Sequence, residues 1–322
     1  VNKLQSYIAE LLGFEAAIFT ASGTQANLIG IMSHCGRGDE YIVGQQAHTY
    51  KYEAGGAAVL GSIQPQPIEF EPDATLDLDK VEEKIKADDI HFARTRLLCL
   101  ENTQNGRPLP LDYLAQAAAF ARNKGLSLHL DGARLFNAAV GQNVAVAEIT
   151  RHFDSVSLCL SKGLGAPVGS VLCGARDFID AARKWRKMCG GGMRQAGILA
   201  AAGLYALENN IERLADDHAL AARLAEQLLD IEGLQVEGGG GPLIHEAHEL
   251  RRGRQTHHCR HQLPGVSAVA AAVGPARGVH TDTHGSPARL AAGLLGEHYL
   301  ESRRRPSLFV LNPAGKPAAL PP

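Results

Sequence analysis

The sequence has no basic excess, no long apolar run and no regular cysteine spacing, and each absence excludes a class of protein. It carries 32 Lys and Arg against 34 Asp and Glu, so a formal net charge of −2 leaves no basic footprint for nucleic acid. No segment reaches the roughly 18 consecutive apolar residues of a membrane-spanning helix. The six cysteines are scattered, mostly in apolar runs, which favours reduced thiols in a cytoplasmic protein over a disulfide framework.

The remaining composition is that of a soluble globular protein. Hydrophobic residues make up 45% and charged residues 20% of the 322 residues. At about 150 residues per domain, this length predicts two domains.

Short apolar runs alternate with helical patterns from residue 1 to about residue 200. We expect strands at 16–20, 41–44, 96–101, 127–131 and 155–160, with helices at 25–34, 113–124 and 144–152. This alternation predicts an α/β fold, a mostly parallel sheet between two layers of helices. Residues 169–173 follow the strand at 155–160 too closely for a crossover helix, so we expect them to form an antiparallel neighbour.

The sequence predicts a large domain at 1–210, a bridging helix and the start of a small domain at 211–237, and an atypical tail at 238–322. One long amphipathic helix is expected over 205–230. The tail opens on four glycines and holds eight of the fourteen histidines and nine arginines, but one lysine and one aspartate. This composition is expected of a small domain that is degraded or read out of frame, or of a natural disordered tail. Because the chain starts inside a helical pattern, we also expect it to lack the natural start of a longer protein.

Lys162 and Asp131 are the most informative pair of residues. Asp131 ends one predicted buried strand, and Lys162 follows another within two residues. In an α/β sheet both lie at the carboxyl edge, where ligands bind and where buried charges need partners. Pyridoxal phosphate uses both groups, an amine for covalent attachment and a carboxylate that keeps its ring nitrogen protonated. Taken singly, Lys162 is also compatible with a solvated strand end, and Asp131 with a helix N-cap.

A turn suited to phosphate follows the first predicted strand. Ser22, Gly23 and Thr24 open a helix, whose free N–H groups and positive dipole end attract phosphate. Glycine allows close approach, and the threonine hydroxyl can donate a hydrogen bond. The same three residues also make an ordinary helix cap.

Two further side chains are candidates at this edge. His48, just beyond the strand at 41–44, can stack on a pyridine ring and exchange protons near neutral pH, or simply pack as a surface histidine. Arg134 offers a planar fork for a substrate carboxylate, or a surface ion pair. The glycines at 163–169 lack the helix that a dinucleotide motif requires, and the histidines at 257–261 lack metal-site spacing, so no metal is expected.

Six phrases together closely resemble those of low-specificity L-threonine aldolases, which are pyridoxal-phosphate enzymes of the aspartate-aminotransferase fold type (fold type I). The resemblance runs from residue 1 to about 236. The phrases are Ser22-Gly-Thr-Gln-Ala-Asn27, His48, Glu101-Asn-Thr-Gln-Asn-Gly106, His129-Leu-Asp-Gly-Ala-Arg134, Ser161-Lys-Gly-Leu-Gly165 and Gly190-Gly-Gly-Met-Arg-Gln195.

The resemblance implies a role for each matching residue. Lys162 matches the lysine that forms the internal aldimine, and Asp131 its pyridinium partner. Gly23 and Thr24 match the phosphate turn, and His48 the histidine stacked on the ring. The remaining matches are Arg134 as a substrate-carboxylate ligand, His91 near the substrate hydroxyl, and Arg194 reaching a phosphate in a neighbouring subunit of a homotetramer.

The implied activity is retro-aldol cleavage of L-threonine or L-allo-threonine to glycine and acetaldehyde, with His48 as the base. Two alternatives stay open: another enzyme of this fold type, such as a β-eliminating lyase or an aminotransferase, and an inactive pseudoenzyme fragment. The family's N-terminal segment and small domain, which complete its substrate site, have no counterpart here, so weaker threonine binding is expected. The sequence does not fix the threonine or allo-threonine preference, or the physiological aldehyde.

Overall fold

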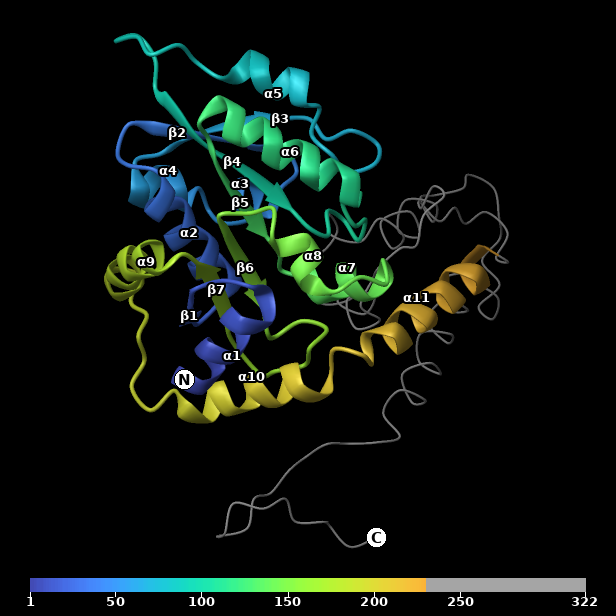
Figure 1. Ribbon diagram of the computed structural model, residues 1–322. Coiled ribbons are helices and arrows are strands. Elements are labelled where there is room, and N and C mark those ends of the chain that lie inside the picture. Colours follow the sequence, from blue (N-terminus) through green and yellow to red (C-terminus); the bar gives the residue numbers. More distant parts are fainter. Residues whose placement is uncertain (230–322) are drawn as a thin grey trace, which may run out of the picture. The chain divides into compact units, whose positions relative to one another are not determined.

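In the computed structural model, residues 1–229 are described (Figure 1). Residues 1–222 belong to one compact unit, and the boundary with a second unit falls after Ala222. The atypical tail predicted at 238–322 lies outside the described residues. The helices are α1 (Asn2–Leu12), α2 (Gly23–His34), α3 (His48–Lys51), α4 (Gly56–Gly61), α5 (Leu78–Lys84), α6 (Leu111–Lys124), α7 (Leu135–Gly141), α8 (Val146–Thr150), α9 (Arg176–Met188), α10 (Gly197–Asn209) and α11 (Leu214–Leu229).

Seven strands form a single sheet in the order β1-β7-β6-β5-β4-β2-β3. β7 runs antiparallel to both of its neighbours, β1 and β6, and all other pairs are parallel. The expected mostly parallel sheet and the antiparallel strand after 155–160 are both confirmed. The strands are β1 (Ala16–Thr20), β2 (Asp39–Gly44), β3 (Gln64–Ile68), β4 (Arg94–Glu101), β5 (Ser127–Asp131), β6 (Ser155–Cys159) and β7 (Ser170–Gly174).

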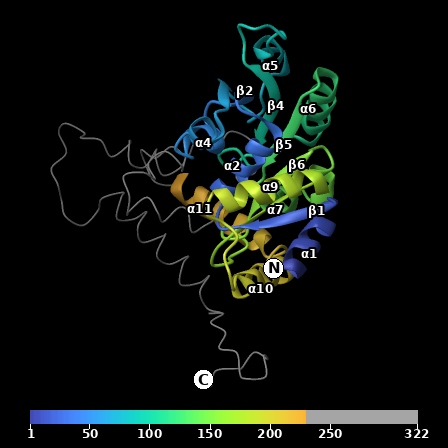
Figure 2. The same ribbon diagram turned by 90° about the vertical axis from the view of Figure 1, so that its left-hand side faces the viewer.

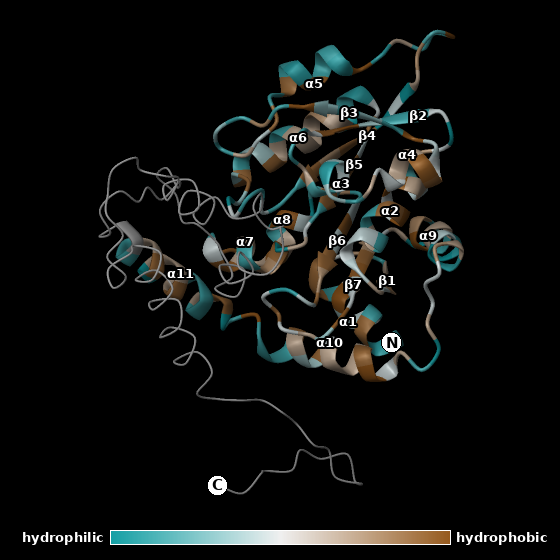
Figure 3. Ribbon diagram, turned by 180° about the vertical axis from the view of Figure 1, so that it is seen from behind, coloured by the Kyte–Doolittle hydropathy of each residue, from teal (hydrophilic) through white to brown (hydrophobic). Residues whose placement is uncertain are grey.

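Helices cover both faces of the sheet, because alternate strand side chains point to opposite sides. On β5, Leu128 and Leu130 join the large apolar cluster formed with α1, α6, α7 and α8. The intervening residues His129 and Asp131 face the other side, where α2 packs on β5, β6 and β7. Figure 2 shows α1 beside β1 at one end of the sheet, and Figure 3 shows β6 and β7 as hydrophobic and α5 as mostly hydrophilic. No described helix combines the length and apolar character needed to cross a bilayer.

Two sequence expectations need correction. The helix expected at 144–152 is only α8 (Val146–Thr150), after a separate α7. The helix expected at 205–230 is broken between Asn209 and Leu214. Asn210 is the C-cap of α10, and its side chain donates to the Leu164 carbonyl at 2.7 Å. This hydrogen bond stabilises the end of α10 at this residue and disfavours continuation of the helix.

The edge strand β3 was missed because it contains two prolines, at positions 65 and 67. Residues two apart on a strand point their N–H groups to the same side. The backbone nitrogens of both prolines, which carry no hydrogen, can therefore point to the open edge of the sheet, where no neighbouring strand would accept a hydrogen bond from them.

A buried polar chain ties α2 to the sheet. The Ser155 hydroxyl lies 2.7 Å from His129 Nδ1 and 2.6 Å from His34 Nε2, so one serine joins a strand histidine to a helix histidine. Gly30 supplies the room for this contact, since a Cβ there would lie 3.1 Å from the His129 ring. The face of α2 that holds these groups is the one that also approaches Asp131.

We expect this packing to be sensitive to acid. Burial lowers the pKa of His129 to about 3 and that of His34 to about 4, whereas an unfolded chain binds these protons near pH 6.5. On acidification the unfolded state therefore binds protons before the folded state does. The contribution of these two histidines to the free energy of unfolding should level off above their unfolded pKa of about 6.5 and fall by a few kcal/mol toward pH 4. Urea unfolding at pH 7.5 and pH 5 measures this loss. A His129→Gln variant should lose less than the wild type on acidification, and equal losses would contradict this account.

Candidate active site

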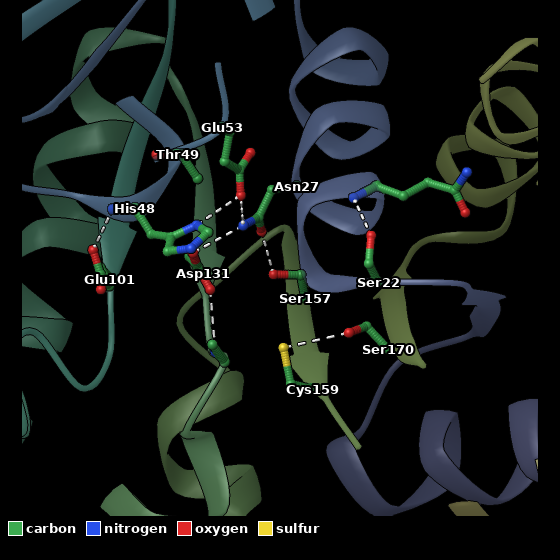
Figure 4. Close-up of polar contacts among 12 residues, drawn as sticks. Ser22, Asn27, His48, Thr49, Glu53, Glu101, Asp131, Ser157, Cys159 and Ser170 are labelled. Atoms are coloured by element: carbon green, nitrogen blue, oxygen red, sulfur yellow. Dashed lines mark hydrogen bonds and ion pairs between the residues drawn. The ribbon is translucent and has the colours of Figure 1, made fainter. Parts of the chain in front are cut away.

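The candidate site lies at the carboxyl edge of the parallel strands (Figure 4). The sheet register places Glu101, Asp131 and Ser157 side by side, at the ends of β4 and β5 and in the middle of β6. His48 opens α3, four residues after β2 ends. The Nδ1 or carboxylate oxygen atoms of His48, Glu53 and Asp131 lie within 4.8 Å of one another. Residues from four separate segments therefore converge on one place.

Asp131 is a buried carboxylate with an incomplete set of partners from the protein. The residue is 2% exposed. One oxygen, Oδ1, accepts from the Ala133 N–H at 3.1 Å, and Oδ2 accepts from Asn27 Nδ2 at 2.8 Å. A carboxylate can accept about four hydrogen bonds, so Asp131 retains capacity for another donor. A protonated ring nitrogen is such a donor.

His48 is held by its backbone and its ring. Its N–H donates to Glu101 Oε2 at 2.8 Å, and its Nδ1 lies 2.9 Å from Glu53 Oε1. The side chain stays 31% exposed. Burial lowers the pKa of His48, but the hydrogen bond to Glu53 and the charge of Asp131 outweigh burial and raise it above 6.5. A partly exposed imidazole whose pKa is raised by its acidic neighbours suits a proton-transfer role.

Glu101 is the second acid that touches His48. Burial and the Asp131 carboxylate raise the pKa of Glu101 to about 7. Three carboxyl groups thus share a small volume, and this repulsion favours a bound cation or a protonated ligand there.

Lys162 lies in the tight loop between β6 and β7. A hydrogen bond from Gly165 N to the Lys162 carbonyl at 2.8 Å closes this loop. The Lys162 charge lowers the pKa values of His48 and Glu101, whereas the Asp131 carboxylate raises both. Lys162 and Asp131 therefore act electrostatically on the same two side chains.

The predicted phosphate turn forms the N-terminus of α2. Ser22 is the N-cap, and its Oγ accepts from Gln25 N at 3.2 Å. Gly23 and Thr24 occupy the first turn of this 12-residue helix, where N–H groups lack intrahelical acceptors. A Cβ on Gly23 would lie 2.8 Å from Cys159 Sγ, at the end of the strand that leads to Lys162. Glycine therefore lets the helix N-terminus sit against the strand next to the lysine.

Gly23→Ala should weaken cofactor binding and lower stability. The added methyl group meets Cys159, so we expect the free energy of unfolding to fall by about 1–3 kcal/mol and the Kd for pyridoxal phosphate to rise. Urea unfolding and fluorescence titration with the cofactor measure the two effects. Gly197→Ala is the matched control, because Gly197 also begins a helix but has no atom within 4 Å of its added Cβ. Equal behaviour of the two variants would contradict this role for Gly23.

Arg134 and Arg194, two further predicted site residues, lie in different places. Arg134 stands at the N-cap of α7, three residues after Asp131, and lies half-buried at the same edge. Arg194 is exposed in the loop between α9 and α10.

His91 lies away from these residues within this chain, and its place near the substrate hydroxyl stays a prediction. It is exposed, lies 2.5 Å from Asp89 and precedes the start of β4, whereas the site lies where β4 ends. The residue type of His91 suits the chemistry, but its loop joins the amino end of β4, which is the end opposite the candidate site.

Sequence reasoning missed Asn27 and Glu53. The Asn27 amide donates to Glu53 Oε1 and Asp131 Oδ2, both at 2.8 Å, and its carbonyl accepts from Ser157 Oγ. Asn27 does lie in the Ser22–Asn27 phrase, one helical turn beyond the cap, so a polar residue on the apolar face of a buried helix was the available signal.

Comparison with known proteins identifies the class. The sequence profile of the beta-eliminating lyase family matches residues 1–238. The chain belongs to the beta-eliminating lyase family. Within that family it groups with the low-specificity L-threonine aldolases, as the following relatives indicate.

The low-specificity L-threonine aldolase of Escherichia coli K12 is 65% identical over 228 residues, which cover 71% of this chain and 68% of that protein. A probable low-specificity L-threonine aldolase of Arabidopsis thaliana is 48% identical over 240 residues, covering 73% and 68%. The crystal structure of a Leishmania major threonine aldolase matches with a TM-score of 0.66 and 25% identity, covering 73% of this chain and 70% of that one. That of a putative L-allo-threonine aldolase from Listeria monocytogenes matches with a TM-score of 0.63 and 26% identity, covering 72% and 64%. The chain thus spans about two thirds of the length of these relatives.

Proposed function

We propose that the chain binds pyridoxal phosphate covalently through Lys162 and cleaves L-threonine and L-allo-threonine to glycine and acetaldehyde. The observation that carries this proposal is the convergence of Lys162, the buried carboxylate of Asp131 and the partly open His48 at one sheet edge. The names of the curated relatives support the same substrate class.

The residues present fit this cofactor by their chemistry. Lys162 offers the amine, Asp131 an acceptor for a protonated ring nitrogen, and the first turn of α2 at Gly23 and Thr24 offers donors to a phosphate. When bound, pyridoxal phosphate supplies an electron sink for the bond that breaks. Asp131 stabilises the positive charge on the ring nitrogen, which that sink requires.

His48 and Arg134 act on the substrate in this proposal. His48 accepts the proton from the β-hydroxyl group, which allows the Cα–Cβ bond to break and the aldehyde to leave. Arg134 binds the substrate carboxylate through its planar guanidinium group and thereby fixes the orientation of that bond. Lys162 would hold the cofactor covalently through its side-chain amine.

We also propose a homotetramer in the cytoplasm, with Arg194 of one subunit binding a phosphate in its neighbour. The exposed position of Arg194, in a loop with glycines 190 and 192 at positive φ, supports such a role between subunits. A phosphate placed between two subunits would be bound more tightly, because the Arg194 guanidinium adds a positive charge and hydrogen-bond donors.

Product analysis separates this function from its rivals. Purified chain with pyridoxal phosphate and L-threonine should yield glycine and acetaldehyde in equal amounts, measured by amino-acid analysis and an alcohol dehydrogenase assay. A β-eliminating lyase would instead release ammonia and a 2-oxo acid, and an aminotransferase would need an acceptor acid. Cofactor binding without any of these products would favour the pseudoenzyme fragment.

A further inference from the structure

Three buried polar side chains, Asn27, Glu53 and Ser157, lie beside His48 and Asp131 (Figure 4). Asn27 and Ser157 are each 2% exposed, and Glu53 is 7% exposed. Buried amides and carboxylates are costly unless their hydrogen bonds are made, so these side chains have to be explained by what they hold. None of the roles proposed above uses these three side chains.

The hydrogen bonds fix the orientation of the Asn27 amide. Its Nδ2 donates both hydrogens, one to Glu53 Oε1 and one to Asp131 Oδ2, each at 2.8 Å. Its Oδ1 accepts from the Ser157 hydroxyl. The reverse orientation would place the carbonyl oxygen against two carboxylates, so only one amide orientation satisfies these contacts.

The Asn27 amide holds Glu53 in contact with His48. The oxygen Oε1 that accepts from Asn27 also lies 2.9 Å from His48 Nδ1. An ionised Glu53 carboxylate has no hydrogen to donate, so toward the imidazole it can only accept, and the proton between them then sits on Nδ1. The other ring nitrogen, Nε2, then carries a lone pair.

We propose that Glu53, oriented by Asn27, is a positioning residue that fixes the tautomer of His48, so that Nε2 is the atom that accepts the substrate's hydroxyl proton. The base role of His48 rests on the proposed function. The tautomer does not, because it is a property of the protein before substrate binds. One asparagine thereby holds both the Asp131 carboxylate and the partner of the base.

The charges around His48 predict how its protonation responds when Glu53 changes. Four charged groups face the imidazole, each from a different segment: Glu53 after α3, Glu101 from β4, Asp131 from β5 and Lys162 from the β6–β7 loop. Burial and Lys162 lower the pKa of His48, and the Glu53 contact is the main influence that raises it. Glu53→Gln keeps the shape but removes the charge, so the pKa of His48 should fall by about one unit.

Histidine ¹⁵N NMR of the full chain loaded with pyridoxal phosphate tests the tautomer, with the His48 signal assigned by its loss in His48→Gln. In the wild type we expect the proton on Nδ1. In Glu53→Gln we expect a lower His48 pKa, an acid limb of kcat against pH that moves to lower pH by a similar amount, and a kcat about tenfold lower. The Kd for pyridoxal phosphate should stay within about twofold, because Lys162, Asp131 and the α2 turn are retained.

Glu40→Gln is the matched control. Glu40 is a fully buried glutamate bonded to Thr95 at 2.7 Å and to Lys86, but it lies at the other end of β2. It should alter stability without moving the His48 pKa or the pH profile. A proton on Nε2 in the wild type would overturn the proposal, as would a Glu53→Gln variant with lower kcat but unchanged His48 pKa and acid limb. If the wild type cleaves no threonine, the proposed function fails, and the His48 signal still decides the tautomer.

Discussion

Lys162→Ala should abolish threonine cleavage, with kcat lowered by about 10³-fold or more. The Lys162 charge acts on both His48 and Glu101, and Lys162 is the amine that the proposed function uses for covalent attachment. The variant should keep its fold, because the Lys162 side chain is half-buried in a loop whose closing hydrogen bonds come from the backbone. Initial rates of acetaldehyde release, with circular dichroism as a check on folding, measure the result.

The matched control for this prediction is Lys80→Ala. Lys80 is an exposed lysine that pairs with Glu71 and Asp77 far along the chain from the site residues. Its loss should leave kcat unchanged, since exposed ion pairs contribute little. A folded Lys162→Ala protein that retains wild-type kcat would show that the cofactor is not held as proposed.

Asp131→Asn should lower kcat by about 10²–10³-fold at saturating pyridoxal phosphate and also weaken cofactor binding. The amide matches the carboxylate in shape, but its single oxygen can accept either from Asn27 Nδ2 or from the Ala133 N–H, and not from both. The amide also cannot stabilise a positive charge on the ring nitrogen, so the electron sink is lost. Steady-state kinetics over a range of cofactor concentrations separates the two effects.

Asp154→Asn provides the comparison at the opposite edge of the sheet. Asp154 precedes β6, and its carboxylate accepts from Leu128 N at 2.7 Å. This change should lower the Tm slightly and leave both kcat and cofactor affinity intact. If Asp131→Asn behaved like Asp154→Asn, the carboxylate would have no part in the chemistry.

The sequence was sufficient for the parallel core and for the residues that end its strands. Five expected strands match β1, β2, β4, β5 and β6 within one or two residues, because buried parallel strands are continuous apolar runs. Lys162 and Asp131 then fell at the same edge by the geometry of parallel strands alone. For these strands, the apolar runs in the sequence and the order of the strands in the sheet lead to the same assignment.

What could not be predicted depends on contacts between distant segments. Glu53 Oε1 contacts His48 and also accepts from Asn27, which lies 26 residues earlier in the chain. The periodicity of the sequence does not predict this contact between Asn27 and Glu53. His91 stays a prediction, because within this chain its loop precedes the amino end of β4.

Attachment of pyridoxal phosphate to Lys162 is the central claim, and chemical trapping tests it most directly. The full chain is loaded with the cofactor, reduced with sodium borohydride to make the link permanent, digested and analysed by mass spectrometry. We predict a pyridoxyl group on the peptide that contains Lys162, and none on any peptide of the Lys162→Ala protein. A pyridoxyl group on another lysine of the wild type, or none on a folded protein saturated with cofactor, would contradict the account.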